Sequence, residues 1–217
     1  MKKGLTELVF ILDRSGSMSG LEPDTIGGFN SLIRKQKDVE GEALVSLVLF
    51  NHESEVIYDR VPIKHVESLT ERQYYACGST ALLDAVGDAI HHIGNVHKYA
   101  REEDVPEKTM VVITTDGMEN ASYKFTVQQI KNMIEHEKTK YGWEFLFLGA
   151  NIDAVGVAQD IGIDAGHASN YCQDEVGVEL NFKCFNTAVT SLRERGKVDA
   201  SWCEETRAYY EKDNQKR

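Results

Sequence analysis

The chain has 217 residues, 41% of them hydrophobic and 27% charged, which is a globular composition and favours one domain spanning residues 1–217. Lysine and arginine number 24 against 35 aspartates and glutamates, a formal net charge of −11 with no basic face, so nucleic acid is excluded as an expected partner. The first apolar run, Leu8–Leu12, is too short for an export signal or a membrane span, so a cytoplasmic protein without membrane contact is expected.

The first third of the chain contains strand and helix patterns in turn. Leu8–Leu12 is a continuous apolar run, which predicts a strand buried on both faces, and Leu44–Phe50 is another. Between them, apolar residues at helical spacing over 26–33 predict a helix. Glu55–Tyr58 follows the second run after a short polar turn, which predicts a hairpin and therefore one antiparallel edge strand.

The alternation continues through the middle of the chain. A helical stripe over 82–93 precedes the apolar run Met110–Thr115, and a further apolar run, Phe145–Leu148, follows later. Between these two strands a helix is predicted to begin with a capping box, because Thr126 stands three residues before Gln129. Strands that alternate with helices predict an α/β sandwich with a mostly parallel sheet and helices on both faces.

Two further helical patterns lie near the carboxyl end. The apolar stripe from Val178 to Leu192 has steps of four and three residues, and a weaker helix is predicted to start near Ser201. The segment 166–217 either completes the helical layer of the domain or forms an element on which a partner docks.

The cysteine pattern predicts free thiols. None of the four cysteines belongs to a CxxC pair, and the spacing of the histidines near them does not suggest zinc. A chain of this length builds a core without a disulfide framework. We therefore expect four reduced thiols, at Cys77, Cys172, Cys184 and Cys203.

Oxygen-bearing side chains follow the predicted strands. In a sheet of this kind, ligands bind outside the carboxyl ends of the strands. Three groups of residues reach that edge: those after the first strand, those after the Met110 strand, and those before the helix that begins near Ala81. Together they supply five candidate ligands, Asp13, Ser15, Ser17, Thr80 and Asp116.

This donor set predicts a hard divalent cation. Carboxylates and hydroxyls without cysteine or histidine select Mg²⁺, Mn²⁺ or Ca²⁺. Each group alone has a simpler interpretation, because aspartate and serine are common in turns, Thr80 is placed to cap a helix, and Asp116-Gly117 is an ordinary turn signal. It is their combination after successive elements that predicts a metal site with a coordination position left for a carboxylate of a partner protein.

The motifs resemble those of the von Willebrand factor type A domain. Residues 12–18, Leu-Asp-Arg-Ser-Gly-Ser-Met, are similar to its first motif, Gly78-Ser79-Thr80 to its threonine loop, and Thr114–Gly117 to its last motif. The resemblance covers about residues 5–165 and, without an export signal, is closest to intracellular bacterial members of the family.

That resemblance implies a Rossmann-like three-layer sandwich with one antiparallel edge strand. It also implies a metal-ion-dependent adhesion site, in which the same five residues hold an Mg²⁺-type ion. The ion in turn coordinates an aspartate or glutamate side chain of a partner protein.

A protein-binding module is therefore the predicted function, and an enzyme is not expected. The alternative is a metal-assisted hydrolase of phosphoesters, but the first motif has Ser15 where an aspartyl phosphotransferase has a second aspartate. A third interpretation is an ion that only stabilises the loops. We also expect Asp13→Ala to abolish metal binding with little loss of stability, since this interpretation puts Asp13 at a solvated edge of the sheet.

Neighbouring residues have less certain roles. Tyr74 and Tyr75 precede the threonine loop and either form the rim of a binding face or pack in the interior. Glu119 and Asn120 follow Asp116 closely, and either tune the site or bind water.

Overall fold

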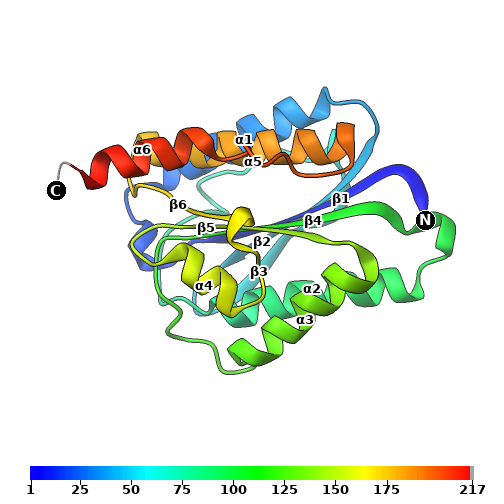
Figure 1. The fold of residues 1–217 in the computed structure, drawn as a ribbon, viewed down its shortest axis with the longest axis horizontal. Helices are drawn as coiled ribbons and strands as arrows, with labels where there is room; N and C mark the ends of the chain where they lie inside the picture. The colour runs from blue at the N-terminus through cyan, green and yellow to red at the C-terminus, as the bar shows by residue number, and fades with distance from the viewer. Residues whose placement is uncertain (216–217) are drawn as a thin grey trace.

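A six-stranded sheet forms the middle layer of the molecule (Figure 1). The computed structural model describes residues 1–215. The strand order is β3-β2-β1-β4-β5-β6, and only β3 is antiparallel to its neighbour. The predicted mostly parallel sheet with one antiparallel edge strand is thus confirmed. The strands are β1 (Lys2–Asp13), β2 (Glu42–Phe50), β3 (Ser54–Pro62), β4 (Pro106–Thr115), β5 (Glu144–Gly149) and β6 (Ala168–Asn170).

Helices cover both faces of the sheet (Figure 1). One layer consists of α1 (Glu22–Lys37), α5 (Glu175–Arg195) and α6 (Glu204–Asn214), and the other of α2 (Leu82–Tyr99), α3 (Val127–Tyr141) and α4 (Ala154–Asp160). The capping box of α3 forms as predicted, with the Thr126 side chain accepting from the Gln129 amide. Among residues 1–215, no helix combines the length and the apolar character that crossing a bilayer requires.

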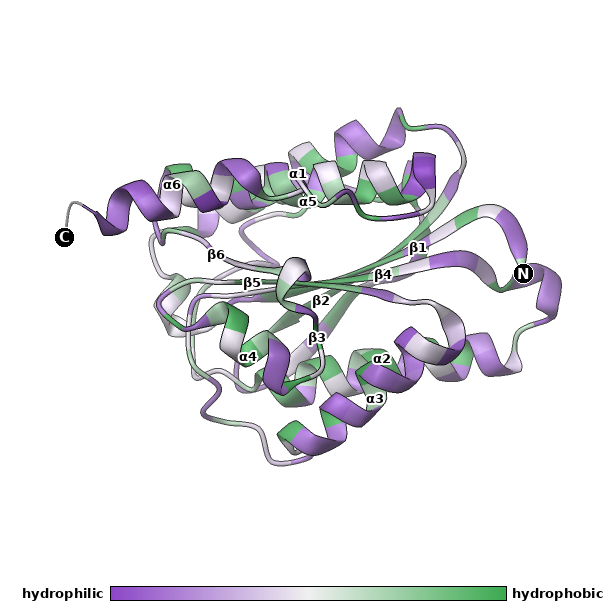
Figure 2. Cartoon of the chain, viewed as in Figure 1, coloured by the Kyte–Doolittle hydropathy of each residue, from purple (hydrophilic) through white to green (hydrophobic). Residues whose placement is uncertain are grey.

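The core lies in two halves, one on each side of the sheet. Along β1, Leu8, Phe10 and Leu12 pack in the cluster beneath α1 and α5. Val9 and Ile11 point the other way, into the cluster beneath α2 and α3. Both sets are buried, which explains why the strand has an uninterrupted apolar sequence. Figure 2 shows the hydrophobic residues of the helices turned toward the sheet.

Three elements differ from the sequence prediction. The short strand β6 and the seven-residue helix α4 were not predicted. The last helix begins at Glu204 rather than near Ser201, because Ser201 lies in a turn in which its backbone amide and hydroxyl donate to the Asp199 carboxylate. Trp202 is buried just before the helix, and its indole N–H donates to the Gly166 carbonyl oxygen.

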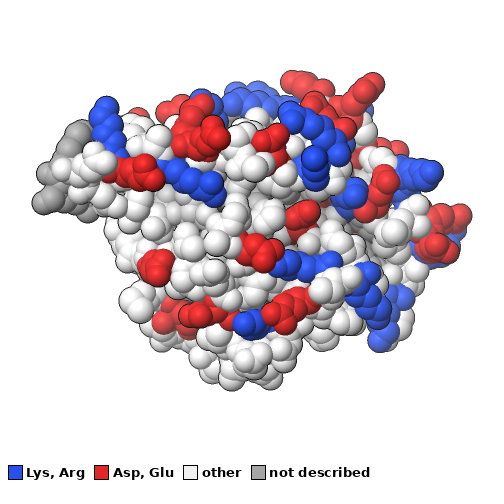
Figure 3. Space-filling view, viewed as in Figure 1, with Lys and Arg blue, Asp and Glu red and all other residues white. Residues whose placement is uncertain are grey.

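A buried group of charged side chains also went unpredicted. Glu7 on β1 is 0% exposed, and its carboxylate accepts two hydrogen bonds from the Arg60 guanidinium, at 2.8 and 3.1 Å. The His97 ring on α2 lies 2.8 Å from the same carboxylate. On the surface, by contrast, acidic and basic side chains alternate, as Figure 3 shows for one face.

Candidate metal centre

The carboxyl ends of β1 and β4 bring the first and last motifs together. These strands are neighbours in the sheet, with Leu12 paired to Thr114. The residues that follow, Asp13 and Thr115, are therefore adjacent, and the Thr115 hydroxyl donates to Asp13 Oδ2 at 2.6 Å. The parallel register itself places Asp13 beside the turn that carries Asp116.

The threonine loop is fastened to the first motif by main-chain hydrogen bonds. The Gly16 amide donates to the Gly78 carbonyl oxygen at 2.9 Å, and the Cys77 amide donates to that of Arg14, also at 2.9 Å. Gly78 has φ = +77°, a conformation that side chains disfavour. The left-handed turn at Gly78 thus lets the loop lie against the first motif and delivers Thr80 to the same edge of the sheet.

The hydroxyls and carboxylates of the two aspartate motifs form a continuous chain. The Ser15 amide donates to Asp13 Oδ1 at 2.6 Å, and the Ser15 and Ser17 hydroxyl oxygens are 3.1 Å apart. The Ser17 hydroxyl donates to Asp116 Oδ1 at 2.6 Å. Four of the five predicted ligands are therefore linked within hydrogen-bonding distance.

Thr80, the fifth candidate, approaches the same space from the helix side. A Cβ atom placed on Gly117 would lie 3.3 Å from the Ser17 Oγ and 3.4 Å from the Thr80 Oγ1. Two hydroxyls from different loops thus converge where Gly117 has no side chain. Helix α2 begins at Leu82 with Ala81 at its cap position, and no side-chain cap is formed. The structure therefore assigns Thr80 no capping role.

Burial makes the site unfavourable for two bare negative charges. It raises the pKa of Asp13, against hydrogen bonds from Thr115 and Ser15. Burial also raises the pKa of Asp116 to about 6, and the nearby Asp13 charge adds to the shift while the Ser17 hydrogen bond opposes it. A cation at this position would relieve both effects.

The donor chemistry fits a hard cation. Within residues 1–215 there is no group of three histidine, cysteine, aspartate or glutamate side chains placed to hold a metal ion. An ion here would have to use hydroxyl oxygens together with Asp13 and Asp116, which is the all-oxygen set that Mg²⁺ and Mn²⁺ accept. With so few protein carboxylates, such an ion would keep water or a partner's oxygen among its ligands.

Asp13 is more deeply placed than the sequence interpretation assumed. Its side chain is 1% exposed rather than solvated, since the Ser15 amide and the Thr115 hydroxyl cover its two carboxylate oxygens. The premise that Asp13 lies at a solvated edge is therefore wrong, and we now expect Asp13→Ala to lower stability. That substitution removes two buried hydrogen bonds in addition to a candidate ligand.

Sequence reasoning missed Gln173, which lies across the site. Its amide nitrogen donates to Asp116 Oδ2 at 2.6 Å and to the Ser17 carbonyl oxygen at 2.7 Å. Its amide oxygen accepts from Asn151 Nδ2 at 2.6 Å. Gln173 stands between β6 and α5, 57 residues from Asp116, and no local pattern marks it.

Glu119 and Asn120 support the threonine loop. The Glu119 carboxylate accepts from the main-chain amides of Leu83, at the start of α2, and Ser122. The Asn120 side-chain oxygen accepts from the Thr80 amide at 2.9 Å. Both residues therefore position the loop that carries Thr80.

The two tyrosines before the threonine loop have different environments. Tyr74 is 1% exposed, and its hydroxyl donates to the Asp13 carbonyl oxygen at 2.5 Å, so it packs beneath the first motif. Tyr75 is half exposed, with the Arg14 guanidinium 5.1 Å from its ring centre. Tyr74 is thus an interior residue and Tyr75 a rim residue.

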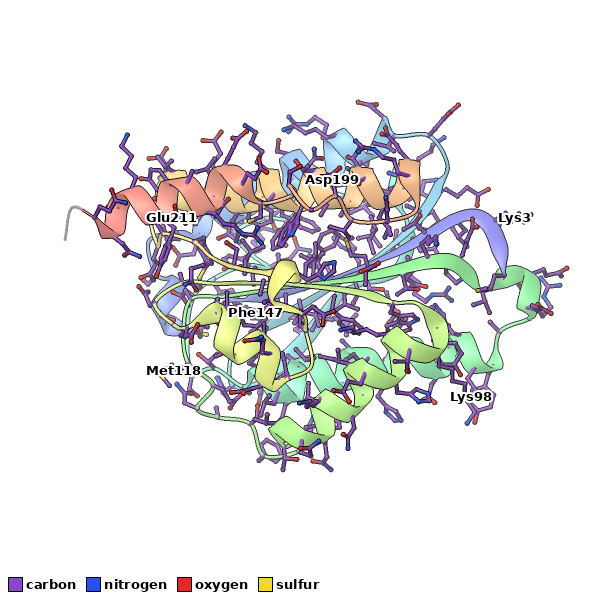
Figure 4. All side chains as sticks on the ribbon, in the orientation of Figure 1. Lys3, Lys98, Met118, Phe147, Asp199 and Glu211 are labelled. Carbon is purple, nitrogen blue, oxygen red and sulfur yellow. The ribbon has the colours of Figure 1, made fainter. Side chains whose placement is uncertain are left out.

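Large apolar side chains are exposed on loops around the site. Besides Tyr75, Met118 is 72% exposed and Tyr123 is 82% exposed. Met118 directly follows Gly117, and Tyr123 lies in the loop that Glu119 orders. In Figure 4 Met118 lies at the end of the molecule opposite Lys3 and Lys98, where the strands have their carboxyl ends.

Comparison with known proteins gives structural matches only. No known family model matches the sequence, and no curated protein sequence does. The vWF domain of the type V pili tip protein Mfa5 from Porphyromonas gingivalis matches with a TM-score of 0.63 at 12% identity, over 89% of this chain and 98% of that one. Proximal thread matrix protein 1 from the mussel byssus matches with a TM-score of 0.59 at 13% identity, over 86% of this chain and 46% of that one.

The same mussel protein, solved with a zinc-occupied MIDAS motif, matches with a TM-score of 0.59 at 13% identity, over 85% of this chain and 46% of that one. This chain thus spans about half the length of the mussel protein. At identities this low, the structural matches establish a common fold and nothing further. Together with the strand order and the single antiparallel edge strand, they show that this chain has the fold of a von Willebrand factor type A domain.

Proposed function

We propose that this chain is a divalent-cation-dependent protein-binding domain. In this proposal Asp13, Ser15, Ser17, Thr80 and Asp116 hold an Mg²⁺-type ion. The observation that carries it is the convergence of the Ser17 and Thr80 hydroxyls at Gly117, next to two buried carboxylates. The zinc-occupied MIDAS motif of the mussel protein, whose structure matches this fold, supports the proposal of a divalent ion.

The ion would supply a coordination position for a carboxylate from the partner protein. The chain's own residues hold the loops in place: Tyr74 fixes the main chain at Asp13, and Asn120 fixes it at Thr80. The net charge of −11 disfavours an acidic partner at long range, but charges beyond about 8 Å are largely screened at physiological salt. A local divalent cation dominates at the contact itself.

The exposed apolar residues give this proposed binding face its contact area. Tyrosine, methionine and arginine are the residue types enriched in protein interfaces. Tyr75 lies on the loop before Thr80, with the buried Arg14 stacked against its ring, and Met118 and Tyr123 both lie on the loop between β4 and α3. We propose that an aspartate or glutamate of the partner reaches the ion while apolar groups beside it contact these side chains.

Thr80 provides the sharpest test of the ion site. Within residues 1–215 its hydroxyl forms no hydrogen bond with another side chain. Thr80→Val therefore removes one proposed metal-ligating oxygen and keeps the shape of the side chain. Thr80→Ser keeps the donor and serves as the matched control. Each protein is stripped with EDTA and unfolded by heat while Mg²⁺ or Mn²⁺ is titrated. The wild type and Thr80→Ser should gain stability with the ion, and Thr80→Val should gain much less.

A second step tests the open coordination position. Potassium acetate is compared with potassium chloride at equal ionic strength, with and without Mg²⁺. Acetate should add stability only in the presence of the ion, and only in the variants that bind it. An ion effect without an acetate effect would mean that the ion merely holds the loops together. No ion effect in the wild type would refute the proposed site.

The phosphoester hydrolase remains the alternative for the same ion. Such an enzyme needs a nucleophile or general base beside the metal. Hydrolysis of p-nitrophenyl phosphate that requires Mg²⁺ and is lost in Thr80→Val would favour the hydrolase over the protein-binding domain.

A further inference from the structure

Two buried thiols meet where the last helix begins, on the helical face away from α2 and α3. Cys184 lies on α5 and Cys203 occupies the N-cap position of α6, and they are 3% and 1% exposed. The two thiols form a hydrogen bond with each other. The Cys184 sulfur is also 2.8 Å from the Thr206 hydroxyl oxygen. Two thiols from separate segments of the chain are thus hydrogen-bonded where α6 begins.

The two thiols are not equivalent. The hydrogen bond from Cys203 lowers the pKa of the Cys184 thiol, against the effect of burial, and the Thr206 hydroxyl lowers it further. The same contact and burial raise the pKa of the Cys203 thiol. The thiolate is the reactive form of cysteine, and Cys184 rather than Cys203 lines a surface pocket, so Cys184 is the nucleophile of the pair.

A pocket gives small molecules access to this nucleophile. It has a volume of about 130 Å³ and is lined by Cys184 together with Lys183, Thr187, Trp202 and Glu205. A water molecule occupies roughly 30 Å³ of liquid, so a hydrogen peroxide molecule fits easily. Lys183 and Glu205 form an ion pair at the same pocket, so their charges offset each other there.

We propose that Cys184 and Cys203 are an oxidisable dithiol, with a small peroxide as its oxidant. The Cys184 thiolate attacks one peroxide oxygen, the O–O bond breaks, and hydroxide leaves, giving a sulfenic acid at Cys184. The Cys203 sulfur then attacks the Cys184 sulfur, the S–O bond breaks, and water leaves. In sum, two thiols lose two electrons and two protons to form one disulfide, and hydrogen peroxide becomes two water molecules.

The disulfide would join α5 to the start of α6. Helix α6 is otherwise attached through polar contacts, among them the Tyr209 hydroxyl to Asp174 at 3.2 Å and the Arg207 guanidinium to the Ala168 carbonyl oxygen at 3.2 Å. A covalent link restricts the unfolded chain and should raise the temperature of unfolding. This inference stands apart from the proposed ion site.

Peptide mapping tests the proposal directly. The four cysteines fall in different tryptic peptides, with Cys184 in 184–193 and Cys203 in 198–207. The intact folded protein is treated with equimolar hydrogen peroxide, remaining thiols are alkylated, and the digest is analysed by mass spectrometry. We expect peptides 184–193 and 198–207 joined, with the loss of two hydrogen atoms, and a higher unfolding temperature that dithiothreitol reverses.

Serine variants separate the two roles. In Cys203→Ser the oxidation should stop at a sulfenic acid on Cys184, which dimedone traps, whereas Cys184→Ser should leave Cys203 reduced. Cys77→Ser is the matched control and should still form the linked peptide. The proposal is overturned if both peptides are recovered alkylated while the half-buried Cys77 is oxidised. That result is read from the wild type, so it holds even if a serine variant fails to fold.

Discussion

Replacement of Gly117 by alanine tests the candidate ion site without removing any ligand. The new methyl carbon would lie 3.3 Å from the Ser17 hydroxyl oxygen and 3.4 Å from that of Thr80. Gly117 is not among the glycines with positive φ, so its backbone accepts alanine. The substitution therefore places an apolar group between two proposed ligands and leaves every oxygen donor in the chain.

The expected effects on folding and on ion binding differ in size. The contact to Ser17 is slightly too tight and the contact to Thr80 is an ordinary van der Waals distance, while the alanine restricts the unfolded chain, an effect worth about 0.4–1 kcal/mol. Without the ion, the free energy of unfolding should thus change by less than about 1 kcal/mol. In the wild type, an ion at 100 times its dissociation constant adds about 2.7 kcal/mol. For a chain of this size that is a rise of roughly 5–11 °C in the unfolding temperature.

The assay is calorimetric unfolding of EDTA-treated protein with and without saturating Mg²⁺. Gly117→Ala should lose most of the ion-dependent rise and keep its unfolding temperature without the ion. Gly27→Ala is the matched control, because a Cβ there meets no atom within 4 Å and the residue lies in α1. It should keep the full ion-dependent rise. A full rise in Gly117→Ala would show that the ion does not use the space between Ser17 and Thr80, and the proposed ligand set would be wrong.

Three further substitutions follow from the contacts described. Gln173→Glu brings a carboxylate to the position that now contacts Asp116 Oδ2 at 2.6 Å. In thermal unfolding it should lower stability without Mg²⁺ and enlarge the Mg²⁺-dependent rise in unfolding temperature, and a smaller rise than in the wild type would contradict this. Glu7→Ala leaves the Arg60 guanidinium without its buried partner and should cost roughly 3 kcal/mol in urea unfolding, and a loss below about 1 kcal/mol would refute that role. Tyr74→Phe removes a buried hydrogen bond to the Asp13 carbonyl oxygen and should cost about 1–2 kcal/mol in the same assay. An unchanged value would count against that hydrogen bond.

Long apolar strands were predictable because burial on both faces leaves a direct trace in the sequence. The sheet centre shows this, since Leu8–Leu12 is apolar without interruption and packs in both core clusters. Strand β6 leaves no such trace. It has three residues, two of them the polar Ser169 and Asn170, and pairs with the end of β5. Its strand conformation depends on its neighbour in the sheet rather than on its own composition.

The candidate site also has a part that was predictable from the sequence and a part that was not. Its five predicted residues stand next to predictable strands and helices. Sheet topology brings four of them to one edge, and the loop fastened to the first motif brings Thr80 there. Gln173 acts on Asp116 through a tertiary contact, and such a contact has no periodicity or spacing that reasoning from a single sequence can use. The burial of Asp13 was mispredicted for a related reason, because its covering groups, the Ser15 amide and the Thr115 hydroxyl, become neighbours only in the folded site.

Asp13 therefore has two roles that a simple substitution cannot separate. Its carboxylate is a proposed ligand, and it also fixes the loop at Ser15 and the end of β4 at Thr115. An alanine there changes the shape of the site and its ligand set together, so loss of ion binding in that variant would not show which was responsible. Substitutions at Thr80 and Gly117 would alter the proposed ion site while removing few contacts on which the fold depends. These two residues are thus the positions at which ion binding can be removed while the loops stay in place, and ion dependence of partner binding should be judged there.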